Sequence, residues 1–216
     1  MIGLLFSEPL FFLIWIAALL IAITVHEFAH AFVADKLGDP TPRLQGRVTL
    51  NPLAHLDPLG TLMLLLVRFG WGKPVQFDPF NLQNPKKDTT LISLAGPAAN
   101  ILLVTIVSIL LRLIQAGIIP GSAAIHTLAQ PFIYLNLVLA IFNLIPIHPL
   151  DGGKILVGLL PERDAIEADQ FLRKYGIVIL ILMLLPIYNG VAPISYFMSP
   201  ILNFLLNIFI PGSTTI

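Results

Sequence analysis

A long apolar run near the N-terminus constrains the fold of this chain more than any other feature. Residues 9–37 are almost entirely hydrophobic, with Pro9 suited to a first helical turn and Gly38 to a helix C-cap. At ~1.5 Å per residue, such a helix would be about 43 Å long, enough to cross a ~30 Å hydrocarbon core. The composition agrees, since 56% of the 216 residues are hydrophobic and only 11% are charged. We therefore expect an integral membrane protein.

Further apolar runs predict an all-α polytopic membrane protein with about five to six transmembrane helices. The runs that follow the first one cover residues 89–115, 128–145, 175–188 and 192–210. The last two contain prolines and can form either one broken hairpin or two tilted spans. We expect a single membrane-embedded domain, residues 1–216, with a core at about residues 9–160 and C-terminal helices at residues 175–210.

The segment between the first two spans is mixed in character. Residues 46–52 (GRVTLNP) predict a short β-strand, whereas residues 58–72 hold only about 12 apolar residues. That stretch is too short to cross a bilayer comfortably, which favours a re-entrant or interfacial piece over a span.

Basic residues indicate an orientation if residues 58–72 do not cross. Two connections then lie on one side, and they carry Lys36, Arg43, Arg47, Arg68, Lys73, Lys86, Lys87, Lys154, Arg163, Arg173 and Lys174. The loop 116–127 on the other side carries no Lys or Arg. By the positive-inside rule the basic side is the cytoplasm, which predicts a multi-pass protein of the cell membrane.

The first run also contains the sequence His26-Glu27-x-x-His30. Residues four apart lie on one face of a helix, so the two imidazoles can bind one Zn²⁺ ion. Glu27, about 100° further round, can then act as a general base without binding the metal. Zinc lowers the pKa of a water bound to it from 15.7 to about 7, which is what amide hydrolysis at neutral pH requires. Lys36 lies only ~9 Å of helix beyond His30, so the site would lie nearer the cytoplasmic face.

Other interpretations of this motif are a structural metal site or a polar cluster without metal. An ionisable group in the middle of a membrane helix costs about 2.5–3.5 kcal/mol on insertion scales, which favours a functional role for three of them. A metal-binding transporter is a rival function, and a catalytically inactive regulator of the same fold is another.

A catalytic zinc usually has three protein ligands and one open position. Glu162 and Glu167 lie among other charges and are typical of a solvated loop. Asp151 follows a helix break at Pro146 and Pro149, where irregular backbone at membrane depth implies a cavity or protein cover. Asp151 is therefore the stronger candidate, the alternative being a simple helix cap.

Two motifs together resemble the site-2 protease family of intramembrane zinc metalloproteases, peptidase family M50. They are TVHEFAHAFVADKLGD (residues 24–39) and NLIPIHPLDGGKIL (residues 143–156), and the compact form without PDZ or CBS domains is similar at GRVTLNPLAHLDPLGTL and GWGKPVQFDP. The resemblance implies His26, His30 and Asp151 as zinc ligands, Glu27 as the general base and Asn143 as a residue holding substrate or oxyanion. It also implies that the small residues of AGPAAN (95–100) pack closely.

The same resemblance implies a zinc-dependent endopeptidase that cleaves transmembrane proteins or remnant signal peptides within the lipid bilayer. The strand 46–52 would pair with the unwound substrate. His148 departs from the family pattern, and it could contact the metal or donate to a ligand. His55 and Asp57 either hydrogen-bond the re-entrant loop or form an auxiliary site. The zero net charge gives no sign of a nucleic-acid partner, and the lack of cysteine excludes thiolate chemistry.

Overall fold

The computed structural model describes residues 6–67, 70–186 and 190–210, and in these ranges its regular structure is helical. The helices are α2 (Pro9–Lys36), α3 (Thr41–Leu44), α4 (Pro58–Val67), α5 (Pro85–Gln115), α6 (Ala123–Asn143), α7 (Asp151–Leu159), α8 (Glu162–Leu184) and α9 (Pro193–Phe209), with short 3₁₀ turns at Pro52–Ala54 and Pro79–Asn81. The predicted all-α class is confirmed for this part of the chain.

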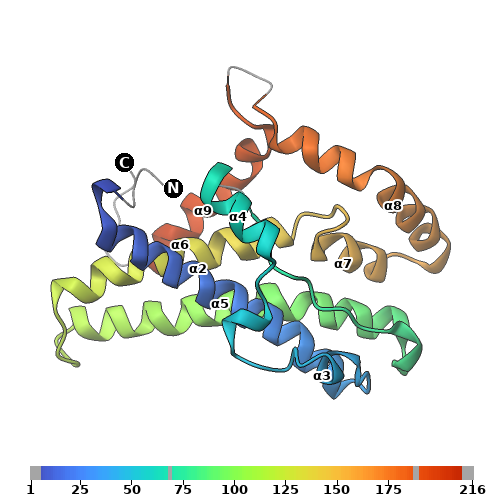
Figure 1. Ribbon diagram of the computed structural model, residues 1–216, viewed down its shortest axis with the longest axis horizontal. Coiled ribbons are helices and arrows are strands. Elements are labelled where there is room, and N and C mark those ends of the chain that lie inside the picture. Colours follow the sequence, from blue (N-terminus) through green and yellow to red (C-terminus); the bar gives the residue numbers. More distant parts are fainter. Residues whose placement is uncertain (1–5, 68–69, 187–189, 211–216) are drawn as a thin grey trace.

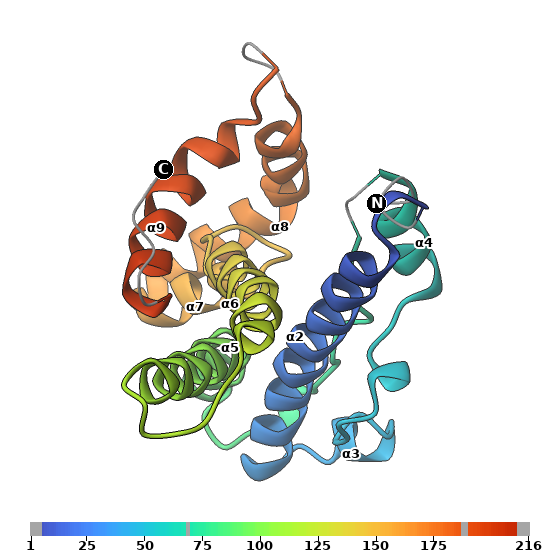
Figure 2. The same ribbon diagram turned by 90° about the vertical axis from the view of Figure 1, so that its left-hand side faces the viewer.

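The core is an antiparallel arrangement of α2, α5 and α6 (Figures 1 and 2). The buried face of α2 repeats every four residues and is made mostly of alanine, which lets a neighbouring helix approach closely. The buried face of α5 has the same spacing at Gly96, Asn100, Val104 and Ser108. An apolar cluster of α5 and α6 residues continues the core toward α9, which packs on α6.

The predicted count of five to six spans is not supported. Three helices are long and apolar enough to cross a membrane, namely α2, α5 and residues Ala124–Asn143 of α6. The apolar part of α8 follows a charged first half, and α9 is shorter, at 17 residues. Residues 187 and 188 of the predicted fourth span lie outside the described residues.

The predicted β-strand at Gly46–Pro52 is wrong, because this segment is a loop followed by a 3₁₀ turn. Its side chains anchor it to neighbouring backbone, and it has no strand partner among the described residues. The guanidinium of the buried Arg47 donates to the carbonyls of Ala54 and Lys73, and Asn51 Oδ1 accepts from Leu53 N. The β-type pairing in this region lies further along the chain, as an isolated antiparallel bridge between Leu56 and Gly72.

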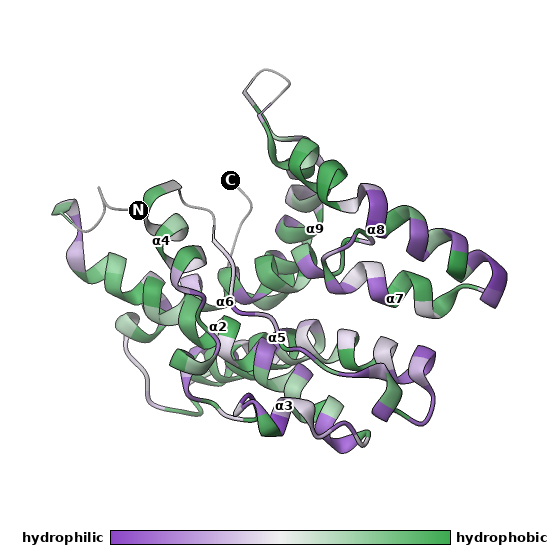
Figure 3. Ribbon diagram, turned by 45° about the vertical axis from the view of Figure 1, so that its right-hand side comes forward, coloured by the Kyte–Doolittle hydropathy of each residue, from purple (hydrophilic) through white to green (hydrophobic). Residues whose placement is uncertain are grey.

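The connections on the two sides of the core differ in polarity. Because α2, α5 and α6 alternate in direction, the end of α2, the start of α5 and the end of α6 lie at one end of the core, and residues 116–122 lie at the other. Helix α4 lies beside the N-terminal half of α2 instead of at either end (Figure 2). Figure 3 shows hydrophilic residues gathered at α3 and along the first part of α8. Helix α4 has only 10 residues, about 15 Å, which agrees with a segment that does not cross. The placement of the basic connections on one side of a membrane stays a prediction.

Candidate metal centre

Helix α2 brings two imidazoles to the buried side of the bundle. His26 and His30 are 3% and 7% exposed, and their rings meet edge to face with centroids 4.6 Å apart. The two Nε2 atoms lie 3.1 Å from each other. The i, i+4 spacing has thus produced the paired donors that the sequence predicted.

Asp151, more than 100 residues later in the sequence, completes this group. Its Oδ2 atom lies 3.2 Å from His26 Nε2 and 3.1 Å from His30 Nε2. The turn that delivers it depends on glycine, because a Cβ on Gly152 would come within 2.4 Å of the carbonyl oxygens of Leu144 and Ile145. Within the described residues, His26, His30 and Asp151 form the group of donors able to hold a metal ion.

Contacts behind the imidazoles fix where their protons lie. His26 Nδ1 is 2.6 Å from Asn100 Oδ1, and His30 Nδ1 is 2.6 Å from the carbonyl oxygen of Ile92. Both Nδ1 atoms must donate to these oxygens, so in the neutral imidazoles both Nε2 atoms turn lone pairs toward the Asp151 carboxylate. Two lone pairs and an anion at such short range need a cation between them.

The spacing of the three donor atoms fits zinc. Ligands at ~2.0–2.1 Å from a tetrahedral ion lie about 3.4 Å from one another, close to the 3.1–3.2 Å found here. Two neutral imidazoles and one carboxylate are a donor set typical of catalytic zinc, with a fourth position left for water or substrate.

Glu27 lies beside this group without joining it. Its Oε2 atom accepts a hydrogen bond of 3.0 Å from the backbone N–H of Val75, in the irregular segment that follows Gly72. Its charge also acts on Arg47, whose pKa is lowered by burial in spite of that carboxylate. The general base predicted by the sequence is therefore held by backbone rather than by metal.

The comparisons with known proteins agree with this geometry. The sequence profile of peptidase family M50 matches residues 114–187. The chain is 40% identical to "Putative zinc metalloprotease YwhC" of Bacillus subtilis, over 87% of this chain and 85% of that protein. This chain belongs to peptidase family M50.

More distant relatives extend the same result. The M50 chain is 33% identical to "Putative zinc metalloprotease Rip2" of Mycolicibacterium smegmatis, over 81% of this chain and 67% of that protein. It is 25% identical to "Zinc metalloprotease MJ0392" of Methanocaldococcus jannaschii, over 83% of this chain but 44% of that protein. No solved structure matches the chain with comparable significance.

Asn143 is the last residue of α6, and it is half-buried in this M50 chain. Its Nδ2 atom donates to the carbonyl of Leu139 at 3.0 Å, which leaves the second amide hydrogen for another partner. The predicted contact with substrate stays a prediction.

His55 and Asp57 serve the loop in which they lie. The fully buried His55 places Nε2 2.8 Å from the carbonyl oxygen of Thr49, and Asp57 Oδ1 accepts from Gly60 N at the start of α4. These contacts support the first of the two predicted roles, hydrogen bonding in the loop, over an auxiliary site.

His148 has a different partner from either of those predicted. Its Nε2 atom lies 3.0 Å from Asp169 Oδ1 on α8, which also pairs with Arg173. Although burial opposes ionisation, the hydrogen bonds from Arg173 and His148 lower the pKa of Asp169. His148 therefore links α8 to the turn that precedes Asp151.

The close packing predicted for residues 95–100 is confirmed at Gly96. A Cβ there would lie 2.4 Å from His30 Nε2 and 2.7 Å from His26 Cε1, so only glycine leaves room for both rings. Sequence reasoning missed the role of Asn100 behind His26. The signal was available, since an amide within an apolar helix is costly unless it is paired.

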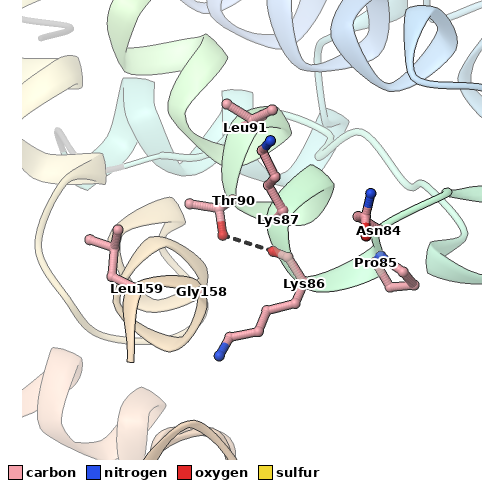
Figure 4. Close-up of a pocket in the computed structure, with 8 residues that line it drawn as sticks. All are labelled: Asn84, Pro85, Lys86, Lys87, Thr90, Leu91, Gly158 and Leu159. Atoms are coloured by element: carbon pink, nitrogen blue, oxygen red, sulfur yellow. Dashed lines mark hydrogen bonds between the residues drawn. The ribbon is translucent and has the colours of Figure 1, made fainter. Parts of the chain in front are cut away.

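A surface pocket of about 400 Å³ is separate from this group of donors. It lies between the start of α5 and the end of α7, where Lys86 and Lys87 point in different directions (Figure 4). Lys86 Nζ donates to the carbonyl of Leu160, and Asp88 already accepts from Asn84 N at this helix start. The pocket offers no group suited to peptide hydrolysis.

Proposed function

We propose that this M50 chain is a zinc-dependent intramembrane endopeptidase that cleaves transmembrane proteins or remnant signal peptides within the lipid bilayer, as in regulated intramembrane proteolysis. The observation that carries the proposal is the triangle of His26, His30 and Asp151, with edges of 3.1–3.2 Å, inside helices of membrane length. The names of the relatives support zinc as the metal and a metalloprotease as the class.

Zinc held by these three side chains would supply Lewis acidity, which lowers the pKa of water and polarises the scissile carbonyl. The protein supplies the proton transfers. The Val75 amide holds one oxygen of Glu27, and we assign Oε1, the other oxygen, to accept a proton from the attacking water and deliver it to the leaving amine.

Asn143 is proposed to help the substrate side of the reaction. Its second amide hydrogen can donate to the substrate carbonyl oxygen as negative charge develops there. Because this hydrogen bond would strengthen in the transition state, loss of Asn143 should lower kcat more than it raises KM.

The location of the site supports cleavage within the membrane from the cytoplasmic side. His30 precedes the end of α2 at Lys36 by about 9 Å of helix, at the end of the bundle where the basic connections are predicted to lie. We therefore propose a multi-pass protein of the cell membrane with its active site nearer the cytoplasmic face.

The test compares wild-type protein in lipid nanodiscs with Glu27→Gln, measuring zinc content and cleavage of a synthetic transmembrane peptide. The expected result is retention of one zinc per chain with activity reduced by at least about 100-fold. The matched control is Glu167→Gln, because Glu167 is exposed on α8 and should tolerate the same change.

The alternatives give different results. A metal-binding transporter would move zinc across a vesicle membrane without cleaving peptide, and an inactive regulator would show no cleavage in the wild type. Full activity in Glu27→Gln would refute the assignment of the base.

A further inference from the structure

Two asparagines lie fully buried where α2, α5 and α6 meet. Asn100 on α5 and Asn136 on α6 both have 0% exposure. An amide in an apolar interior costs free energy unless its donors and acceptors are paired. Asn136 takes no part in the proposed chemistry, so an amide at this fully buried position of α6 needs a reason.

A continuous series of hydrogen bonds joins Asn136 to the metal centre. Asn136 Oδ1 accepts from Asn100 Nδ2 at 2.8 Å, and Asn100 Oδ1 lies 2.6 Å from His26 Nδ1. Asn100 Nδ2 also donates to the carbonyl of Ala22 on α2 at 3.1 Å. The series therefore connects all three helices of the core.

Backbone carbonyls fix the direction of both amides. The carbonyl oxygen of Ala22 can only accept, so Asn100 must present its nitrogen there and its oxygen to His26. The carbonyl oxygen of Phe132 likewise accepts from Asn136 Nδ2 at 2.8 Å, which leaves Asn136 Oδ1 for Asn100. If either amide were flipped, its oxygen would face another acceptor and its nitrogen would face another donor.

We propose that Asn136 is a positioning residue for the metal ligand His26 and acts through Asn100. With the amide of Asn100 held, His26 must carry its proton on Nδ1 and keep Nε2 as a metal donor. The inference rests on the proposed zinc site, and it assigns to α6 a part in holding a ligand that belongs to α2. Partners of this kind commonly change metal affinity 10- to 100-fold.

The experiment uses the full-length zinc-loaded protein and measures the rate at which zinc transfers to a chromogenic chelator. The variants are Asn136→Leu, Asn100→Ala and the double substitution. Leucine has as many side-chain heavy atoms as asparagine and suits a buried helix position, so Asn136→Leu should fold. Thr105→Val is the control, because Thr105 also bonds a carbonyl four residues back on α5 but lies outside the series.

We expect zinc release to be roughly 10- to 100-fold faster in Asn100→Ala and about tenfold faster in Asn136→Leu, with Thr105→Val unchanged. The double variant should release zinc no faster than Asn100→Ala, since Asn136 acts only through that residue. The absorption bands of the Co²⁺-substituted protein should shift in Asn136→Leu and not in Thr105→Val.

Three results would overturn the inference. One is zinc release at the wild-type rate in Asn136→Leu, and another is additive effects in the double variant. If Asn100→Ala fails to fold, an unchanged Co²⁺ spectrum in Asn136→Leu is the third. A wild-type protein that binds no zinc would instead refute the proposed site itself.

Discussion

Gly96→Ala tests the packing of the metal centre with a single added methyl group. The new Cβ would lie 2.4 Å from His30 Nε2, 2.6 Å from His30 Cε1 and 2.7 Å from His26 Cε1. Ordinary contact begins at 3.4 Å, so His30 must move by about 1 Å and His26 by about 0.7 Å. Zinc–ligand distances tolerate only about 0.2 Å, and the three donors cannot all be kept.

The substitution should impair the site more than the fold. Overpacking costs about 1–3 kcal/mol, while replacing glycine inside a helix returns about 1 kcal/mol. A 1 Å misplacement at a reacting centre can lower activity by about 100-fold, equivalent to about 2.7 kcal/mol. We therefore expect folded Gly96→Ala with weakened zinc binding and at least that loss of activity.

The assay combines zinc titration against a competing chelator with thermal unfolding of the zinc-free protein. Ala98→Val is the control, because Ala98 is exposed two residues along the same helix. Wild-type zinc affinity in Gly96→Ala would refute the reasoning, since it would mean that the imidazoles do not lie against α5 as described.

Two further predictions concern stability. The fully buried side chain of Asp39 accepts hydrogen bonds from Thr41, Asp78 N and Asn81. Burial alone would raise the pKa of Asp39, but these hydrogen bonds lower it. Its contribution should be complete above the unfolded-state pKa of about 3.9 and be lost as the pH falls through the lower folded-state value. Asp39→Asn should therefore unfold about 1–3 kcal/mol more easily at pH 7, with the difference shrinking below about pH 4; a difference independent of pH would contradict this. Removing zinc with a chelator should lower the free energy of unfolding of the wild type by about 2.7 kcal/mol, compared with protein in free zinc at 100 times Kd. The same treatment should affect Asp151→Asn much less. Equal losses of stability in both proteins would count against Asp151 as a ligand.

Parts of the site could be predicted from the sequence because short stretches of sequence determine them. His26 and His30 share a helix face by spacing alone, and Asp151 stood out because it follows a break between two prolines. Gly96 was predicted only as part of a small-residue element. Its contact with both imidazoles depends on how α5 packs against α2.

The failures came from interactions between distant residues. The strand expected at residues 46–52 does not form because Arg47 reaches Ala54 and Lys73, contacts that no local pattern encodes. The count of five to six spans is not supported, because the first half of α8 is charged and α9 has only 17 residues. The role proposed for Asn136 was hidden for a similar reason, since the sequence of α6 does not reveal that its partner lies on α5.

X-ray absorption at the zinc edge tests the central claim most directly. Protein purified in lipid nanodiscs should contain one zinc per chain, with two imidazole ligands and oxygen ligands at ~2.0–2.1 Å. The imidazole signal should fall by half in His26→Ala, and an oxygen scatterer should change in Asp151→Ala. Absence of zinc, or a ligand shell that neither substitution alters, would contradict the account.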